Sequence, residues 1–159
     1  IGAVGRQDLL LDPADWQEVI DTDLTAPFLV ARRVAPGMMK RGHGKIINTC
    51  SLMSERARYG TAAYAAAKGG IGQLTMALAN EWAGKGVNVN SIAPGYIATD
   101  NNQALRDDAA RNEQLLVRIP AGKWGSPDDL KGAVVWLSSR AADYVHGSIV
   151  IVDGGWMGR

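Results

Sequence analysis

Tyr64 and Lys68 stand four residues apart in the Ala- and Gly-rich stretch GTAAYAAAKGG, residues 60–70. On a helix, residues at this spacing leave the same face about one turn apart. A phenol ordinarily loses its proton at about pH 10, and a nearby ammonium stabilises the phenolate. The pair is therefore suited to exchange a proton with an alcohol or carbonyl oxygen. The same spacing also occurs on ordinary helices whose lysine only reaches water, so the neighbouring motifs must decide.

Two neighbouring motifs favour the chemical interpretation. Ser51 lies thirteen residues before Tyr64, directly after the β-prone run KIINTC, and its hydroxyl can hold the oxygen that Tyr64 protonates. The loop PGYIAT, residues 94–99, follows the second β-prone run, VNVNSIA. Parallel sheets bind ligands at the carboxyl ends of their strands. We therefore expect the site between Ser51 and this loop.

The elements that must position these residues alternate along the chain. Asp12 and Pro13 are typical of a helix N-terminus, and Pro27 is expected to bend or restart that helix near Leu24 to Ala26. The other predicted elements are a strand at 45–51, a helix at 62–83, a strand at 87–93, a partly helical flap at 101–119, a helix from Ser126 and a strand at 148–152. This order predicts an α/β fold with parallel strands and right-handed crossovers.

Composition excludes several classes of function. The 159 residues are 47% hydrophobic, which fits one domain over 1–159, and the net charge of +1 without a basic block excludes a nucleic-acid partner. The absence of an apolar run of about 18 residues predicts no membrane span. One cysteine, Cys50, allows no internal disulfide and no multi-thiolate metal site, and it favours a cytoplasmic location. His43 and His146 are expected to be surface residues, so no metal site is predicted.

The motifs KIINTCS, YAAAK, NVNSIAPGYIAT and VDGGW resemble, in this order, the short-chain dehydrogenase/reductase family over almost the whole chain. The resemblance implies a doubly wound, Rossmann-type parallel sheet and an NAD- or NADP-dependent alcohol dehydrogenase or ketone reductase, with NAD favoured. It implies that Tyr64 is the catalytic acid/base, that Lys68 assists it and holds the nicotinamide ribose, and that Ser51 positions the substrate. The residues that it implies as contacts for the nicotinamide end of the cofactor are Pro94, Gly95, Ile97 and Thr99.

Within the family, residues 80–159 are most similar to dehydrogenases of keto or deoxy sugar acids. This similarity implies a sugar-acid substrate, a homotetramer for the full-length protein, and a substrate lid over residues 101–118. An arginine of the lid, Arg106, Arg111 or Arg118, is a candidate partner for a substrate carboxylate, although each also fits a solvated surface. Trp156, beside the terminal DGG, is a candidate for a subunit interface.

The chain departs from the family pattern at two places. Asp23 stands where the family has an asparagine that supports a proton relay, so this acid either holds a water molecule or pairs with Lys68. The family's Gly-rich phosphate loop has no match, so we expect the later part of the domain, an incomplete sheet that lacks the N-terminal βα units. An open sheet edge and bare apolar faces then predict weak cofactor affinity and aggregation. The alternative to an enzyme is a non-catalytic remnant that only pairs with other subunits.

Overall fold

A computed structural model describes residues 12–57 and 59–159. The described residues form one parallel sheet in the order β1-β2-β3, with β1 at Gly44–Thr49, β2 at Val87–Pro94 and β3 at Ile149–Val152. Both strand pairs are parallel. The prediction of an α/β fold with a parallel sheet is confirmed.

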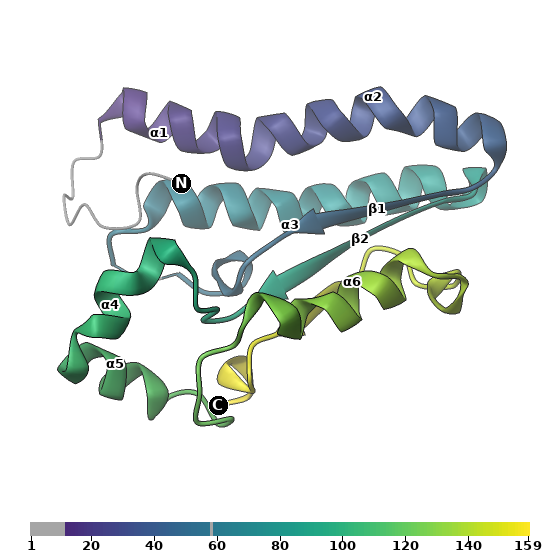
Figure 1. Ribbon diagram of the computed structural model, residues 1–159. Helices are drawn as coiled ribbons and strands as arrows, with labels where there is room; N and C mark the ends of the chain where they lie inside the picture. Colours follow the sequence, from purple (N-terminus) through teal and green to yellow (C-terminus); the bar gives the residue numbers. More distant parts are fainter. Residues whose placement is uncertain (1–11, 58) are drawn as a thin grey trace.

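Helices cover both faces of the sheet (Figure 1). Their bounds are α1 Pro13–Ile20, α2 Ala26–Arg41, α3 Ala62–Trp82, α4 Gln103–Asp107, α5 Ala109–Leu116 and α6 Lys131–Ser138. On one face, Val87 and Val89 of β2 pack against Leu78 of α3 and Ala31 of α2. On the other face, Ile92 packs against Leu137 of α6. The middle strand is therefore buried on both sides, which explains its almost unbroken run of buried residues.

The first helical segment changes its winding just before Pro27. The Asp12 side chain caps α1 by accepting a hydrogen bond from the Ala14 amide at 2.7 Å. A π-helical turn, Asp21–Thr25, then joins α1 to α2. Proline has no N–H to donate and its ring crowds the carbonyl four residues earlier, so a wider turn there relieves both problems. This confirms the expected irregularity, and it places Asp23 within the wider turn.

The loop after β2 begins one residue later than the sequence suggested. Pro94 was expected to start that loop, yet it is the last residue of β2 and pairs in register with Val152. The Cys50 amide donates a hydrogen bond to the Ile92 carbonyl, so the backbone groups of Ile92 face β1. Pro94 lies two residues later on the strand and faces the same edge, so its missing N–H is on the side of β1. Because β1 has already ended there, the missing N–H of Pro94 breaks no ladder bond.

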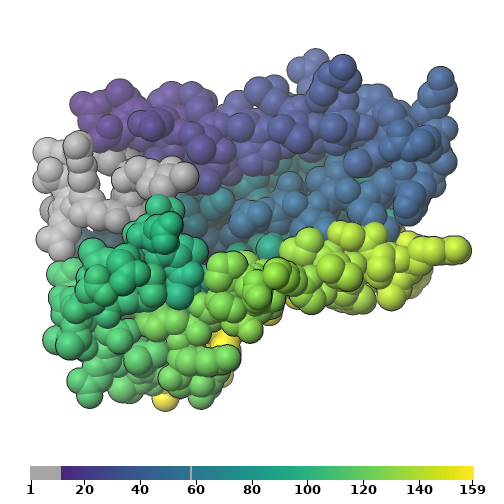
Figure 2. Space-filling model, viewed as in Figure 1, coloured from purple at the N-terminus to yellow at the C-terminus, as the bar shows by residue number. Residues whose placement is uncertain are grey.

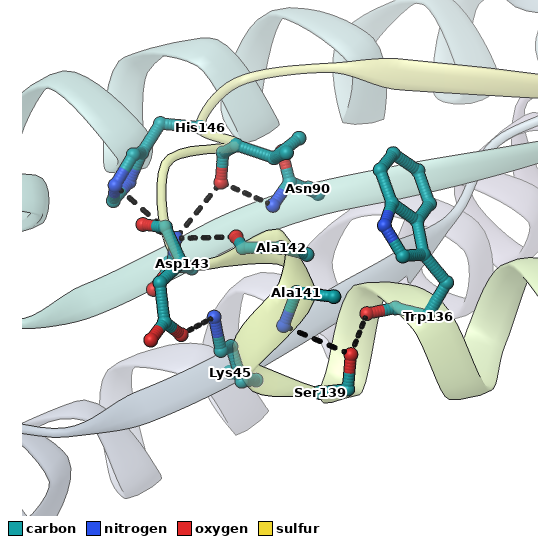
Figure 3. Close-up of polar contacts among 10 residues, drawn as sticks. Lys45, Asn90, Trp136, Ser139, Ala141, Ala142, Asp143 and His146 are labelled. Carbon is teal, nitrogen blue, oxygen red and sulfur yellow. Dashed lines mark hydrogen bonds and ion pairs between the residues drawn. The ribbon is translucent and has the colours of Figure 1, made fainter.

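Two asparagines of β2 fasten the segment that precedes β3 (Figure 3). Asn88 donates to the carbonyls of Asp143 and Val145 at 3.0 and 2.8 Å, and Asn90 also donates to Val145 at 2.8 Å. His146 is half-buried, with its Nε2 3.1 Å from Asn88 Nδ2. The expectation that His146 is a surface residue is therefore wrong, because this segment folds back onto the buried amides of β2.

An ion pair strengthens the same junction. Lys45 Nζ lies 2.7 Å from Asp143 Oδ1, with the lysine side chain 9% exposed and the aspartate side chain 53% exposed. The hydrogen bond from Lys45 lowers the pKa of the Asp143 carboxyl below its ordinary value of 3.8. A carboxyl with a lowered pKa stabilises the fold at pH values above its ordinary pKa. That contribution is lost as the pH falls through the lowered pKa.

The variant Asp143→Asn is accordingly expected to melt at a lower temperature than the parent at pH 7, and the difference is expected to be smaller at pH 3. Thermal unfolding followed by circular dichroism at the two pH values measures this. Asp128→Asn is the matched control, because Asp128 and its partner Lys131 are both largely exposed and their pair contributes little. A loss in Asp143→Asn that is equal at both pH values would contradict the electrostatic explanation.

Candidate functional site

Ser51 lies on a short capped turn at the carboxyl end of β1. We call residues 51–54 the Ser51 turn. Ser51 Oγ accepts a hydrogen bond from the Met53 amide at 3.2 Å, and Ser54 Oγ accepts one from the Ser51 amide at 3.3 Å. A hydroxyl that accepts still has its own proton to donate. Ser51 is half-buried, so this proton is available to an oxygen placed above the sheet edge.

Lys68 lies at the centre of the site. It is 8% exposed, donates to the Thr49 carbonyl at 3.1 Å, and lies 3.0 Å from Asp23 Oδ1. Its Nζ is 5.6 Å from the centroid of the Tyr64 ring. One ammonium thus ties together the end of β1, the π-helical turn and the tyrosine on α3. An ammonium has three donors, so a third direction remains for a ligand.

Asp23 adopts one of the two arrangements that the sequence left open, the direct ion pair with Lys68. The two side chains are 25% and 10% exposed, respectively. Gly70 of α3 faces the same turn, where a Cβ would lie 2.9 Å from Leu24 Cδ2. The acid therefore replaces the family's neutral amide with a charge that contacts the ammonium directly.

Two further residues position the site, and the sequence reasoning missed both. Ser54 Oγ donates to the Lys68 carbonyl at 2.7 Å, which joins the Ser51 turn to α3. Thr49 contributes only its backbone carbonyl, which no side-chain pattern reveals. Ser54 did leave a signal, since the Ser-x-x-Ser spacing with Ser51 is that of a reciprocal helix cap.

The loop after β2 lies against the C-terminal turn. A Cβ on Gly95 would approach the Asp153 Cα to 2.6 Å, so a glycine is required where the loop and the turn meet. The Asp153 carboxylate accepts hydrogen bonds from the amides of Gly155 and Met157 at 2.8 and 2.7 Å. The VDGG motif thus shapes a turn that brings Met157 toward the Ser51 turn.

Ile97 and Thr99 occupy the far part of the same loop. Ile97 forms an isolated bridge with Gly125, and Thr99 is exposed at the start of the 3₁₀ turn Asp100–Asn102. Tyr96 packs edge-on against Trp156, with ring centroids 6.1 Å apart. Trp156 therefore packs within the chain, while its proposed role at a subunit interface stays a prediction.

The structure separates the three arginines of the flap. Arg106 is held by Asn102 Oδ1 at 3.1 Å and by the Thr99 carbonyl at 3.2 Å, and Arg111 Nε lies 3.5 Å from Asp108. The Arg118 guanidinium instead stacks over Trp156, 4.8 Å from the ring centroid. In the space-filling view the flap projects as a lobe beside α6, and C-terminal residues show in the angle between them (Figure 2).

The residues present fit the nicotinamide end of a dinucleotide cofactor. Lys68 retains a donor direction beside Tyr64, and the exposed Thr99 and the Gly95 backbone border the same edge of the sheet. The adenine end has no Gly-rich phosphate loop in these 159 residues. Among residues 12–57 and 59–159, no group of three or more His, Cys, Asp or Glu residues is placed to hold a metal ion. Within that part of the chain, no helix is both long and apolar enough to cross a membrane.

Comparison with known proteins places the chain in one family. A family profile described as enoyl-(acyl carrier protein) reductase matches residues 2–157. A 2-dehydro-3-deoxy-D-gluconate 5-dehydrogenase of Pseudoalteromonas atlantica is 58% identical, over 91% of this chain and 57% of the relative. This chain thus spans somewhat over half the length of that relative.

Two solved structures share the fold. One is an Agrobacterium tumefaciens protein provisionally named 2-deoxy-D-gluconate 3-dehydrogenase, with bound NADP; it is 53% identical, has a TM-score of 0.91, and is matched over 94% of this chain and 61% of its own. The other is a gluconate 5-dehydrogenase of Burkholderia cenocepacia in complex with NADP and tartrate, 46% identical with a TM-score of 0.91, matched over 94% and 58%. The chain belongs to the short-chain dehydrogenase/reductase family.

Proposed function

We propose that residues 1–159 form the catalytic, C-terminal part of a single short-chain dehydrogenase domain. In this proposal the enzyme transfers a hydride between a nicotinamide coenzyme and a secondary alcohol or ketone of a sugar acid. The observation that carries it is the position of Lys68, which contacts Thr49 beside the Ser51 turn and lies 5.6 Å from the Tyr64 ring. That arrangement supplies a proton donor and a stabilising cation at the edge where parallel sheets bind ligands.

The proposed mechanism divides the work among the three candidate residues. Ser51 donates a hydrogen bond from its hydroxyl to the substrate oxygen, keeps its proton, and fixes the orientation of that oxygen. Tyr64 removes the alcohol proton during oxidation, or returns it during reduction, at its phenolic oxygen. Lys68 stabilises the phenolate and holds the ribose next to the nicotinamide, while Asp23 and Thr49 hold Lys68 in place. The nicotinamide, when bound, supplies or accepts the hydride.

The proposed substrate is 2-dehydro-3-deoxy-D-gluconate, oxidised or formed at C5. Support comes from the 58% identity to an enzyme of that name. Oxidation of gluconate at C5 or of 2-deoxy-D-gluconate at C3 is the alternative, because solved relatives carry those names. The relative complexed with tartrate supports a hydroxy acid, a class that includes all three candidate substrates.

NAD is the proposed coenzyme, as the sequence resemblance favours it, and NADP is the alternative, since it is bound in both solved relatives. The protein expressed from its complete coding sequence is expected to reduce NAD⁺ or NADP⁺ when given one of the three sugar acids. Absorbance of the reduced coenzyme at saturating substrate ranks the two coenzymes and the three acids. No reduction with any of the six combinations would refute the proposed activity.

A non-catalytic chain that only pairs with other subunits is the second candidate, favoured by the exposed apolar side chains Phe28, Leu29 and Val30 of α2. A fluorescence titration of the 159-residue chain with NADH separates the two candidates. A saturable enhancement is expected if the site binds the nicotinamide end, whereas a linear response up to millimolar NADH would favour the non-catalytic chain.

We also propose a cytoplasmic homotetramer for the full-length protein. The exposed apolar side chains of α2, which are Phe28, Leu29, Val30 and Val34, support an assembly that covers them. The single cysteine, which is buried, supports a reducing compartment. Light scattering after gel filtration measures the assembly.

A further inference from the structure

Three arginines from distant parts of the chain line one cavity of about 250 Å³. Arg56 follows the Ser51 turn, Arg118 lies at the end of the flap, and Arg159 is in the C-terminal turn. Trp156 and Met157 complete the lining. The C-terminal turn is held against the end of the flap by the Ala121 amide, which donates to the Gly154 carbonyl at 2.9 Å, and residues far apart in sequence thereby meet.

Within the described part of the chain, none of the three guanidinium groups is paired with a carboxylate. Arg118 stacks on the neutral ring of Trp156, and Arg159 donates to the Val117 carbonyl at 2.5 Å. A guanidinium has five N–H donors, so most donors of the cluster remain free for a ligand. Three like charges around one cavity disfavour one another unless an anion lies between them.

The cavity adjoins the candidate catalytic serine. A narrow hollow beside Ser51 is lined by Met157, which also lines the arginine cavity, and by Glu55. The hollow itself has no room for a water molecule, so Met157 stands between Ser51 and the arginines, and a ligand that reached both would pass this side chain. Glu55 repels a carboxylate from the serine end, while the arginines attract it to the other end. The two charges together favour one orientation of an acidic ligand.

Resting on the proposed function, we propose that Arg56, Arg118 and Arg159 bind the carboxylate of the sugar acid and direct its reacting carbon toward Ser51. The planar fork of an arginine matches the two oxygens of a carboxylate. A phosphate of the coenzyme offers similar oxygens. The carboxylate is favoured because Met157 lines both the cavity and the hollow beside Ser51, the residue proposed to hold the substrate oxygen.

Calorimetric titrations of the 159-residue chain with D-gluconate and with neutral D-sorbitol test this inference. D-gluconate is expected to bind more tightly than D-sorbitol, and Arg118→Gln is expected to weaken gluconate binding about 10- to 100-fold, the range for a lost charge-assisted hydrogen bond. The matched control is Arg111→Gln, which removes an arginine of the same flap that already pairs with Asp108 and lies outside the cavity. This control is expected to bind gluconate as the parent does.

Equal binding of gluconate and sorbitol, or gluconate binding that Arg118→Gln leaves unchanged, would overturn the inference. So would tighter binding of inorganic phosphate or NADP⁺ that depends on Arg118, because the cavity would then serve the coenzyme. Kinetics of the protein expressed from its complete coding sequence provide a second measurement. There, a raised KM for the acid in Arg118→Gln with a kcat within about threefold of the parent is expected.

Failure of the inference and failure of the proposed function are distinguishable. Dehydrogenase activity with an unchanged KM in Arg118→Gln leaves the function standing and removes the arginine subsite. Arg118-dependent binding of gluconate without any dehydrogenase activity leaves the subsite standing and removes the function.

Discussion

Tyr64→Phe is expected to lower kcat about 10²- to 10⁴-fold, the range for loss of a general acid/base, while the fold stays intact. Phenylalanine keeps the ring beside Lys68 and removes only the hydroxyl that exchanges the proton. Initial rates with the preferred sugar acid and coenzyme, measured on the protein expressed from its complete coding sequence, give the ratio. Substrate binding should change little, so the loss should appear in kcat rather than in KM.

Tyr144→Phe is the matched control for this experiment. Tyr144 is 100% exposed, and removing its hydroxyl should leave both kcat and the melting temperature as in the parent. A Tyr64→Phe variant with parental activity would refute the role of Tyr64, and with it the mechanism. An inactive variant with an altered circular dichroism spectrum would instead point to a folding defect.

Lys68→Met is expected to lower the initial rate at least about 100-fold and also to destabilise the fold. The Lys68 side chain is 10% exposed, and its removal leaves the Asp23 carboxylate, itself 25% exposed, without its cation. Breaking a buried ion pair costs about 3 to 5 kcal/mol, and the partial exposure of Asp23 reduces this to about 2 kcal/mol here. Urea unfolding and initial rates measure the two effects separately.

A double-mutant cycle with Asp23→Asn separates charge from chemistry. In the Lys68→Met background, Asp23→Asn removes the stranded charge and is expected to recover most of the lost stability without recovering activity. In the parent background, Asp23→Asn should lose stability but keep measurable activity. Additive effects on the free energy of unfolding would mean that Asp23 and Lys68 do not stabilise each other.

The same cycle addresses the departure from the family at Asp23. Without this acid, the ammonium of Lys68 loses the carboxylate that lies 3.0 Å from it, so initial rates of Asp23→Asn are expected to fall below those of the parent. Parental rates in Asp23→Asn would show that the acid serves only the stability of the fold.

Much of the fold could be read from local sequence signals. Asp12 and Pro13 marked the start of α1, and the proline at 27 marked the irregular turn, because capping and the missing N–H act on the nearest residues. The β-prone runs predicted β1 and β2, and their alternation with helices predicted a parallel sheet. The spacing of Tyr64 and Lys68 predicted that both lie on one helix, since that relation depends only on helical geometry.

Tertiary structure alone decided what these residues contact. Sequence left Asp23 with two possible partners, and the packing of the π-helical turn against α3 determined that it pairs with Lys68. The sequence also predicted that His146 is a surface residue, whereas the fold places that side chain beside Asn88.

The flap arginines illustrate the same limit. By sequence, Arg106, Arg111 and Arg118 were equivalent candidates, and only the folded chain shows that the first two are engaged locally while Arg118 joins Arg56 and Arg159 around one cavity. Sequence determined the chemistry of the Tyr64–Lys68 pair because that chemistry lies within one helical turn. Contacts between residues tens of positions apart depend on chain crossings, and these are set by the packing of the whole domain.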